Sequence, residues 1–241
     1  MSKYGELAQV LRSAITDGTY PQGSRLPTIP ALCDLYEVSN TTVKRALDEL
    51  EADGLVARRR GSGIYVKRSV GADASTTSGT SVAGQMSGLS AEYAALGKVV
   101  ESDVKEFSVI HPSEQVAAAL GISCESFVYN ICRVRIVDGT PKNVEHTLMP
   151  LDVIPGLVER HLHGSIYHYI ESDLHLRIDS AHRVVRAVAP TADERSWLRL
   201  KDGEPLLEIS QVGYLDDGTP FECSRTRHTS DYEFRVISSR S

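Results

Sequence analysis

The sequence has no long hydrophobic run and few cysteines. No stretch of its 241 residues approaches the roughly 20 apolar residues of a transmembrane helix, and residues 1–20 lack the apolar core of a signal peptide. The four cysteines are scattered and include no C-x-x-C pair, which argues against a disulfide framework and a thiolate zinc site. These absences predict a cytoplasmic protein with reduced thiols and no membrane segment.

The composition is that of a globular protein, with 41% hydrophobic and 24% charged residues, enough for one large or two modest domains. The net charge of -6 is unevenly distributed. Residues 1–68 hold 10 Lys and Arg against 8 Asp and Glu, whereas the remainder holds 16 against 24. A mildly basic head on an acidic body indicates separate roles, and we expect the body to avoid nucleic acid.

Three helices are expected in the head. Apolar residues at helical spacing predict the first over about residues 3–17, before a glycine stop. A second, shorter helix follows "RLPT". The third begins at Ser39, a good N-cap, and ends at Gly54, a good C-cap. Its inward residues are Val43, Ala46, Leu47 and Leu50. The tight "YEVS" turn between the last two helices is typical of a helix-turn-helix.

A basic hairpin follows the third helix. In "LVARRRGSGIYVKR" two short strands, residues 55–59 and 64–67, flank a Gly-Ser-Gly turn. No other part of the chain has so many cations so close together. A hairpin of this kind after a helix-turn-helix is a wing, and its basic tip suits a nucleic-acid backbone or minor groove.

The outward face of the third helix suits the major groove of DNA. It presents Asn40, Thr41, Lys44 and Arg45, with short polar side chains at the N-terminal end followed by cations. In a recognition helix this end meets base edges, and hydroxyls and N–H groups are available to phosphates.

These residues carry a family resemblance. The segment "GSRLPTIPALCDLYEVSNTTVKRALDELEADGLVARRRGSGIYV" resembles the winged-helix head of GntR transcription regulators, with its G-x-x-LP, VS-x-x-TV-x-x-AL-x-x-L and G-x-G-x-x-V landmarks in order. Ile29, Pro30 and Asn40 stand where many members have a Glu-Arg pair and an Arg, so the common operator sequence is not expected. The residues expected to bind DNA are Arg25, Thr28, Ser39, Asn40, Thr41, Thr42, Lys44, Arg45, Arg59, Arg60, Gly61, Ser62 and Gly63.

Residues 69–88 have the composition of a linker, rich in Ser, Gly, Thr and Ala. The expected organisation is a winged helix-turn-helix DNA-binding domain over residues 1–68, a flexible linker over 69–88, and a second domain over 89–241.

The second domain contains an internal repeat. Residues 119–145 and 198–224 align without a gap at an offset of 79, and each unit predicts a helix, a strand, an Asp-Gly turn and a second strand. We therefore expect an antiparallel sheet of two similar hairpins with helices packed on it. In this alignment Arg133 and Arg135 face Val212 and Tyr214, so the arginines serve something other than the hairpin fold.

Arg133 and Arg135 lie two apart on a predicted strand and share a face. Guanidinium groups suit phosphate or carboxylate because their planar fork donates two parallel hydrogen bonds. A second candidate anion site is the helix expected to start at Ser165, where hydroxyl and N–H groups meet the positive end of the helix dipole. Tyr167 adds a phenol.

The second domain resembles the UTRA effector domain of the HutC branch of GntR regulators, through "SGLSAEY", R-x-R, the two DG-x-P turns and G-S-x-Y. The resemblance implies an α+β fold, with a chorismate-lyase-like antiparallel sheet, and dimerisation through this domain. It implies a small anionic effector, a sugar phosphate or amino-sugar phosphate, or alternatively a carboxylate metabolite. The implied effector-binding residues are Leu89, Ser90, Arg133, Arg135, Glu145, Ser165, Ile166, Tyr167, Glu222 and His228.

Two other functions are weighed. An enzyme is disfavoured because catalytic, P-loop and dinucleotide motifs are missing, and the histidines at 161, 163, 168 and 175 lack metal-ligand spacing. A DNA-binding protein whose body only dimerises leaves the two arginines unexplained. We expect no catalytic residue, no cofactor and no metal site, and operator DNA, an effector and a second copy of the chain as partners.

Overall fold

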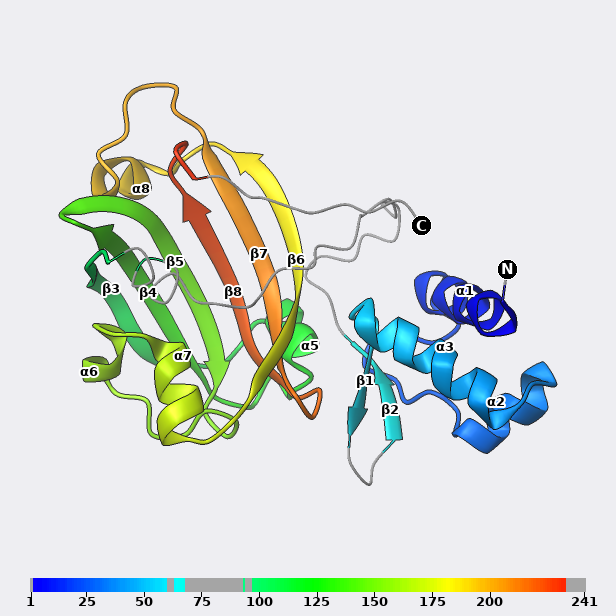
Figure 1. Ribbon diagram of the computed structural model, residues 1–241. Helices are drawn as coiled ribbons and strands as arrows, with labels where there is room; N and C mark the ends of the chain where they lie inside the picture. The colour runs from blue at the N-terminus through cyan, green and yellow to red at the C-terminus, as the bar shows by residue number, and fades with distance from the viewer. Residues whose placement is uncertain (1, 60–62, 68–92, 94–96, 233–241) are drawn as a thin grey trace.

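The computed structural model describes residues 2–59, 63–67, 93 and 97–232. It contains a small helical part with a two-stranded sheet, and a larger part built on one six-stranded sheet (Figure 1). Each part has its own hydrophobic core. The predicted linker lies outside the described residues.

The helical part has the predicted elements. The helices are α1 (Lys3–Thr16), α2 (Ile29–Tyr36) and α3 (Asn40–Ala52), followed by strands β1 (Val56–Arg59) and β2 (Gly63–Val66), which pair antiparallel. The three helices and the wing are therefore confirmed, with ends within one or two residues of the prediction.

Side-chain caps fix where these helices begin. Ser2, Thr28 and Ser39 each accept a hydrogen bond from a backbone N–H three residues further on. The α2–α3 turn is closed by Glu37, which adopts a left-handed backbone at φ 50°. The sharp turn sets α2 and α3 at an angle to each other, as in a helix-turn-helix (Figure 1).

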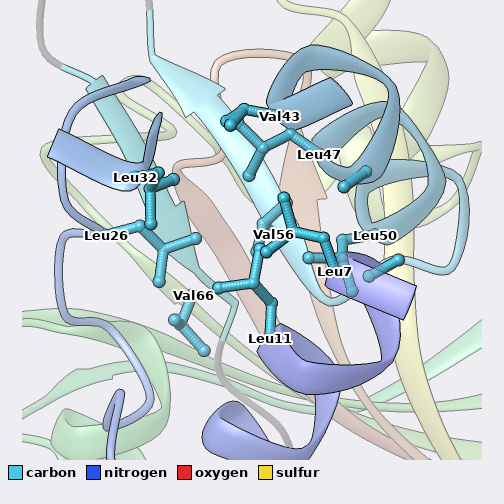
Figure 2. Packing of buried hydrophobic residues seen from close by; sticks show 11 residues of the cluster. Leu7, Leu11, Leu26, Leu32, Val43, Leu47, Leu50, Val56 and Val66 are labelled. Carbon is cyan, nitrogen blue, oxygen red and sulfur yellow. The ribbon is translucent and has the colours of Figure 1, made fainter. Parts of the chain in front are cut away.

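The core of the head lies where the three helices meet the wing. Leu11 of α1, Leu32 of α2 and Leu47 of α3 are fully buried together with Val56 of β1 (Figure 2). Arg12 of α1 also contacts Glu49 and Asp53 at the end of α3, and its Nη2 lies 3.4 Å from the Glu49 carboxylate. The recognition helix is thus held on a rigid support.

The larger part is an antiparallel sheet with strand order β3-β4-β5-β8-β7-β6. Its strands are β3 (Val100–Ile110), β4 (Val128–Val137), β5 (Thr140–Pro150), β6 (Ile178–Val188), β7 (Leu206–Leu215) and β8 (Pro220–His228). The helices are α5 (Glu114–Leu120), α6 (Glu159–Leu162), α7 (Ile166–His168), the π-helix η1 (Tyr169–Asp173) and α8 (Ala192–Trp197).

The internal repeat is visible in this order. Each half is a strand, a helix and a hairpin, β3-α5-β4-β5 and β6-α8-β7-β8, and the halves meet where β5 pairs with β8. The hairpins were predicted. The long first strand of each half was not, because β3 and β6 form the sheet edges and lack the apolar pattern of buried strands.

The ungapped alignment of the two halves is wrong within the strands. The β4–β5 loop has two residues, but the β7–β8 loop contains an additional aspartate. Arg135 pairs with Asn143, and the matching pair in the second half is Gly213 with Glu222. The structural equivalents of Arg133 and Arg135 are therefore Gln211 and Gly213, and the arginines are still absent from the second copy.

The two faces of the sheet have different covers. Alternate residues of β4 and β5, such as Ile131 and Met149, pack with residues 151–178, which include α6 and α7. The intervening residues, such as Cys132 and Val144, pack against Leu198, which follows α8. The segment between the two halves thus roofs one face, and it is beneath this roof that a cavity forms.

We predict that Leu47→Ala lowers the free energy of unfolding of the head by about 2 to 5 kcal/mol, because the side chain is fully buried and a cavity remains. Urea unfolding followed by far-ultraviolet circular dichroism measures this change.

The control is Leu35→Ala on α2, where the same substitution affects a side chain that is 61% exposed. This variant should stay within about 0.5 kcal/mol of the unmodified chain. Equal effects of the two substitutions would contradict the proposed core.

Candidate ligand-binding and nucleic-acid-binding sites

A cavity of about 130 Å³ lies between the sheet and the segment that roofs it. Its floor is formed by side chains of β4, β5, β7 and β8, and Ser165, Ile166 and Tyr167 form part of its wall. The volume is close to that of cavities known to hold a six-membered ring, about 150 Å³. The cavity is lined largely by polar and charged side chains.

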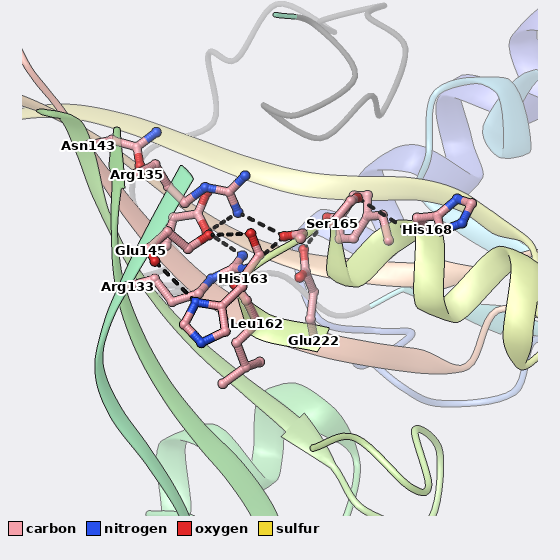
Figure 3. Close-up of polar contacts among 12 residues, drawn as sticks. Arg133, Arg135, Asn143, Glu145, Leu162, His163, Ser165, His168 and Glu222 are labelled. Atoms are coloured by element: carbon pink, nitrogen blue, oxygen red, sulfur yellow. Dashed lines mark hydrogen bonds and ion pairs between the residues drawn. The ribbon is translucent and has the colours of Figure 1, made fainter. Parts of the chain in front are cut away.

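Arg133 of β4 lies in the cavity floor. Its Nη2 donates to the Glu145 carboxylate at 2.5 Å, and its Nη1 donates to the carbonyl oxygens of Leu162 at 2.8 Å and Gly164 at 3.3 Å (Figure 3). Only 5% of the residue is exposed. The guanidinium group therefore ties the sheet to the turn that begins α7.

Arg135 follows on the same face of β4. Its Nη1 lies 3.5 Å from the Gly164 carbonyl oxygen and 3.8 Å from the Glu145 carboxylate, and 2% of the residue is exposed. Two guanidinium groups thus share one carboxylate. The local charge of the three side chains is +1.

The electrostatics of this group follow from burial and pairing. Burial alone would raise the pKa of Glu145, but Arg133 and Arg135 outweigh it and lower that pKa. Burial lowers the pKa of Arg135, and Glu145 opposes the change. Glu145 is therefore a carboxylate at neutral pH and occupies the position of an anion facing the arginines.

A second polar group lies in the other half of the sheet. The Tyr167 hydroxyl donates to Glu222 Oε1 at 2.6 Å, and the Gln211 amide donates to the same oxygen. Arg183 Nε donates to Gln211 Oε1 at 2.8 Å. Burial raises the pKa of Glu222, although both hydrogen bonds oppose this. The group offers hydroxyl, amide and carboxyl groups to a ligand.

His228 lines the cavity near the arginine pair, because it pairs with Asn143, which in turn pairs with Arg135. Burial lowers its pKa to about 4, so its imidazole is neutral at neutral pH. The ring stacks on Tyr232 at a centroid distance of 3.8 Å, and its Nδ1 lies 3.5 Å from the Asn143 amide nitrogen.

A helix starts at Ser165 as predicted, and it is short. The Ser165 hydroxyl accepts from the backbone N–H of His168 at 3.2 Å, and α7 has three residues before the π-helix begins. The hydroxyl lines the cavity but already caps the helix, so the helix dipole contributes less than the sequence indicated.

The cavity brings together all eight predicted effector residues that the structure describes. Leu89 and Ser90 lie outside the described residues. Sequence reasoning missed the other lining residues, of which the polar ones are Asn143, Thr147, Arg183, Gln211, Ser224, Thr226 and Tyr232. Alternation along β5 from Glu145 and along β8 from Glu222 would have found four of them.

The predicted DNA-binding residues of α3 form an exposed surface. Asn40, Thr41, Lys44 and Arg45 are exposed. The hydroxyls of Ser39 and Thr42 lie 2.8 Å apart, and Ser39 caps the helix. These two side chains are therefore partly occupied within the helix start, and the other four are better placed to contact bases and phosphates.

The wing is braced at its base. Arg25 forms a β-bridge with Tyr65 and crosses the wing at Gly63, where φ is +119° and a Cβ atom would lie 2.5 Å from the Arg25 Nε. Arg58 pairs with Asp48 and Glu51 of α3 at 2.5 Å, so its charge is compensated within the head. Arg59 ends β1, and the predicted contacts Arg60, Gly61 and Ser62 lie outside the described residues.

The four clustered histidines have ordinary structural surroundings. His161 stacks on Tyr169 at a centroid distance of 4.1 Å, and His163 lies 3.4 Å from the Ser102 carbonyl oxygen. Within residues 2–59, 63–67, 93 and 97–232, no three His, Cys, Asp or Glu side chains come together as a metal site. No helix in those ranges is long and apolar enough to cross a membrane.

A winged helix-turn-helix followed by a sheet with a cation-lined cavity defines a class of protein, the ligand-responsive transcription regulators. Residues 3–66 match the family described as "Bacterial regulatory proteins, gntR family", and residues 95–233 match the UTRA domain. The chain belongs to the GntR family, and its domain order is that of the HutC subfamily.

Known regulators are similar to this chain over nearly its whole length. The chain is 38% identical to the HTH-type transcriptional regulator GmuR of Bacillus subtilis over 96% of this chain and 95% of that protein. It is 31% identical to the Escherichia coli repressor MngR, over 98% of this chain and 96% of that protein. The crystal structure of the B. subtilis regulator YydK superposes with a TM-score of 0.58 at 26% identity, covering all of both chains. These relatives are named as transcriptional regulators, and the chain is a transcription regulator of the same family.

We predict that Glu222→Gln changes the pH dependence of stability. Burial raises the pKa of Glu222 on folding, so ionisation of this residue destabilises the native state as the pH rises from the ordinary glutamate value to the raised one. Glutamine removes this cost. The variant should therefore gain stability relative to the unmodified chain as the pH rises over that range, and the gain should then level off. Urea titrations at a series of pH values measure this difference in the free energy of unfolding.

Glu171→Gln, at an exposed position of η1, is the matched control. A difference for Glu222→Gln that does not vary with pH would contradict the charge cost assigned to this residue.

Proposed function

We propose that the protein is a cytoplasmic repressor that binds operator DNA as a homodimer and is controlled by a small phosphorylated ligand. Residues 1–68 would bind DNA, 69–88 would link the parts, and 89–241 would bind the effector and dimerise. The family membership and the basic, exposed face of α3 support the DNA-binding role. The cavity supports the effector-binding role.

The observation that carries the effector proposal is the pair of buried arginines that, among the described residues, form ion pairs with one shared carboxylate, that of Glu145. A ligand carboxylate brings one charge and two oxygens, and so only replaces Glu145. A phosphate ester brings about 1.5 to 2 negative charges and three acceptor oxygens, enough for both guanidinium groups. The site therefore favours phosphate over carboxylate.

The second polar group supports a sugar at the other end of the ligand. Glu222, Gln211 and Tyr167 offer several hydrogen-bond donors and acceptors to a ligand, in contrast to the concentrated positive charge of the arginine pair. Such groups suit sugar hydroxyls or an amine. The relative MngR is named as the repressor of a mannosyl-D-glycerate transport and metabolism system, a system for a sugar derivative. We propose a sugar phosphate or an amino-sugar phosphate as the effector.

The DNA-binding proposal follows from the head. A homodimer would present two copies of α3 to successive major grooves, so the operator would be pseudo-palindromic. Asn40 would contact base edges and Lys44 would contact phosphates. The wings would follow the backbone.

We predict that sugar phosphates raise the unfolding midpoint of the protein by about 5 to 10 °C at a hundred times the dissociation constant. This follows from about 2.7 kcal/mol of binding stabilisation and about 2 to 4 °C per kcal/mol. The double variant Arg133→Ala, Arg135→Ala should lose the shift. Differential scanning fluorimetry against sugar phosphates, their unphosphorylated parents and small carboxylates measures it.

Two further variants make this experiment decisive. Arg133→Lys with Arg135→Lys keeps the charge facing Glu145, so it folds where the alanine variant fails, but it loses the planar fork. Arg225→Ala removes an arginine that does not line the cavity and should leave the shift intact. If only carboxylates stabilise the protein, the proposal of a phosphorylated effector is wrong, whereas the proposal of a ligand-controlled regulator still stands.

We predict that Lys44→Ala weakens binding to operator and random DNA alike and reduces the slope of log affinity against log salt by about 1, because one phosphate contact is lost. Asn40→Ala should mainly reduce discrimination between bases, by about 1 to 3 kcal/mol at one position. Fluorescence anisotropy over a range of salt concentrations separates the two effects.

The control for both is Lys201→Ala, an exposed cation of the larger part. If Asn40→Ala weakens binding to operator and random DNA equally, or if Lys44→Ala weakens binding to the operator alone, the assigned roles are wrong.

A further inference from the structure

The outer face of β6 and β7 contacts the DNA-binding head. This face is turned away from the cavity, and β6 is the sheet edge nearest the wing (Figure 1). The contacting residues are Ser180, His182 and Tyr214 on the sheet, and Gly54 and Lys67 at the base of the wing.

Lys67 follows β2 and inserts into this face. Its ammonium donates to the Ser180 hydroxyl, lies 3.6 Å from the Asp179 carboxylate and stands 5.2 Å from the centroid of the Tyr214 ring. Only 5% of the residue is exposed. Lysine is rarely buried without such partners, and here an ion pair, a hydrogen bond and a cation–π contact are combined.

A second contact lies beside the first. His182 Nε2 forms a hydrogen bond with the Gly54 carbonyl oxygen, in the turn that links α3 to the wing. The imidazole packs against the edge of the Tyr214 ring at a centroid distance of 5.6 Å and an angle of 64°. Tyr214 is 2% exposed, with the Lys67 ammonium over its ring, so this part of the outer face is buried where the head contacts it.

We propose that the outer face of β6 and β7 is a docking surface for the base of the wing, with Lys67 as the inserted group. The occupant is the base of the wing of the same chain, which contributes Gly54 before β1 and Lys67 after β2. The contacts are polar and few, which is typical of interfaces between domains that separate and rejoin. Burial lowers the pKa of Lys67, and Asp179 opposes this, so the ammonium gains solvation when the head leaves.

The test is a zero-length carbodiimide cross-link in the full chain without ligand or DNA, so its outcome is independent of the proposed function. The reagent activates Asp179, which is half exposed, and Lys67 then forms the amide. Mass spectrometry of the digested protein should identify the Lys67–Asp179 link. The Lys142–Asp231 pair of the larger part serves as a positive control.

Variants distinguish docking from chance encounter. His182→Ala leaves both reacting groups in place but removes one contact, and the yield should fall roughly fivefold, as expected for the loss of one hydrogen bond. Arg186→Ala is the control, since it lies on the same face of β6 and, among the described residues, makes no hydrogen bond or ion pair with the head. Its yield should not change.

Mixing nitrogen-15-labelled and unlabelled protein shows whether the link joins one chain or two. Links of uniform isotope composition support docking within a chain. Links of mixed composition would overturn it in favour of an exchange between copies. The absence of the Lys67–Asp179 link while Lys142–Asp231 forms would overturn the docking surface altogether.

Discussion

The burial of two guanidinium groups in the floor of the sheet is the constraint on which the site depends. Charges removed from water are costly unless they are paired and hydrogen-bonded. Arg133 and Arg135 meet this requirement with Glu145 on the adjacent strand and with carbonyl oxygens of the turn at 162–164. The two arginines that give the cavity its charge also hold the turn at 162–164 that roofs it. An anion bound to the arginines would therefore change the position of this turn as well as the local charge.

The second half of the sheet, β6-α8-β7-β8, lacks the arginine pair that the first half carries. Gln211 takes the place of Arg133, and Gly213 takes the place of Arg135. A Cβ atom at Gly213 would lie 2.7 Å from the Phe221 ring and 2.8 Å from Glu222 Cγ, so the second half uses this space for its own side chains. One half therefore supplies the arginine pair with Glu145, and the other supplies Glu222, Gln211 and Arg183. A ligand that spans both halves meets different groups at its two ends.

Much of this could be predicted from the sequence. The caps and apolar spacing indicated the three helices of the head, because these signals are local. The resemblance to UTRA domains implied eight residues of the cavity, five of them within R-x-R and G-S-x-Y. The edge strands β3 and β6 could not be predicted in this way, since their stability depends on pairing with β4 and β7 rather than on an apolar pattern. The one-residue shift between the halves was missed because an extra aspartate in a loop changes the register without disturbing the DGTP motif. Arg183 and Gln211 were missed for a related reason: they lie across the sheet from the motifs.

Residues on one strand point alternately to the two faces, and on β6 this places His182 next to Arg183. The first contacts the head, and the second is hydrogen-bonded in the cavity wall. On β7 the same holds for Tyr214 and Gln211. Hydrogen bonds weaken steeply with distance and angle, and packed strands move as units. A ligand that shifts β6 by a few tenths of an ångström therefore acts on both faces at once, and by linkage the position of the head must then alter the affinity for that ligand. On β6 the residue in the cavity wall, Arg183, is adjacent to the residue that contacts the head, His182. No long chain of contacts is therefore needed to couple the cavity to the head.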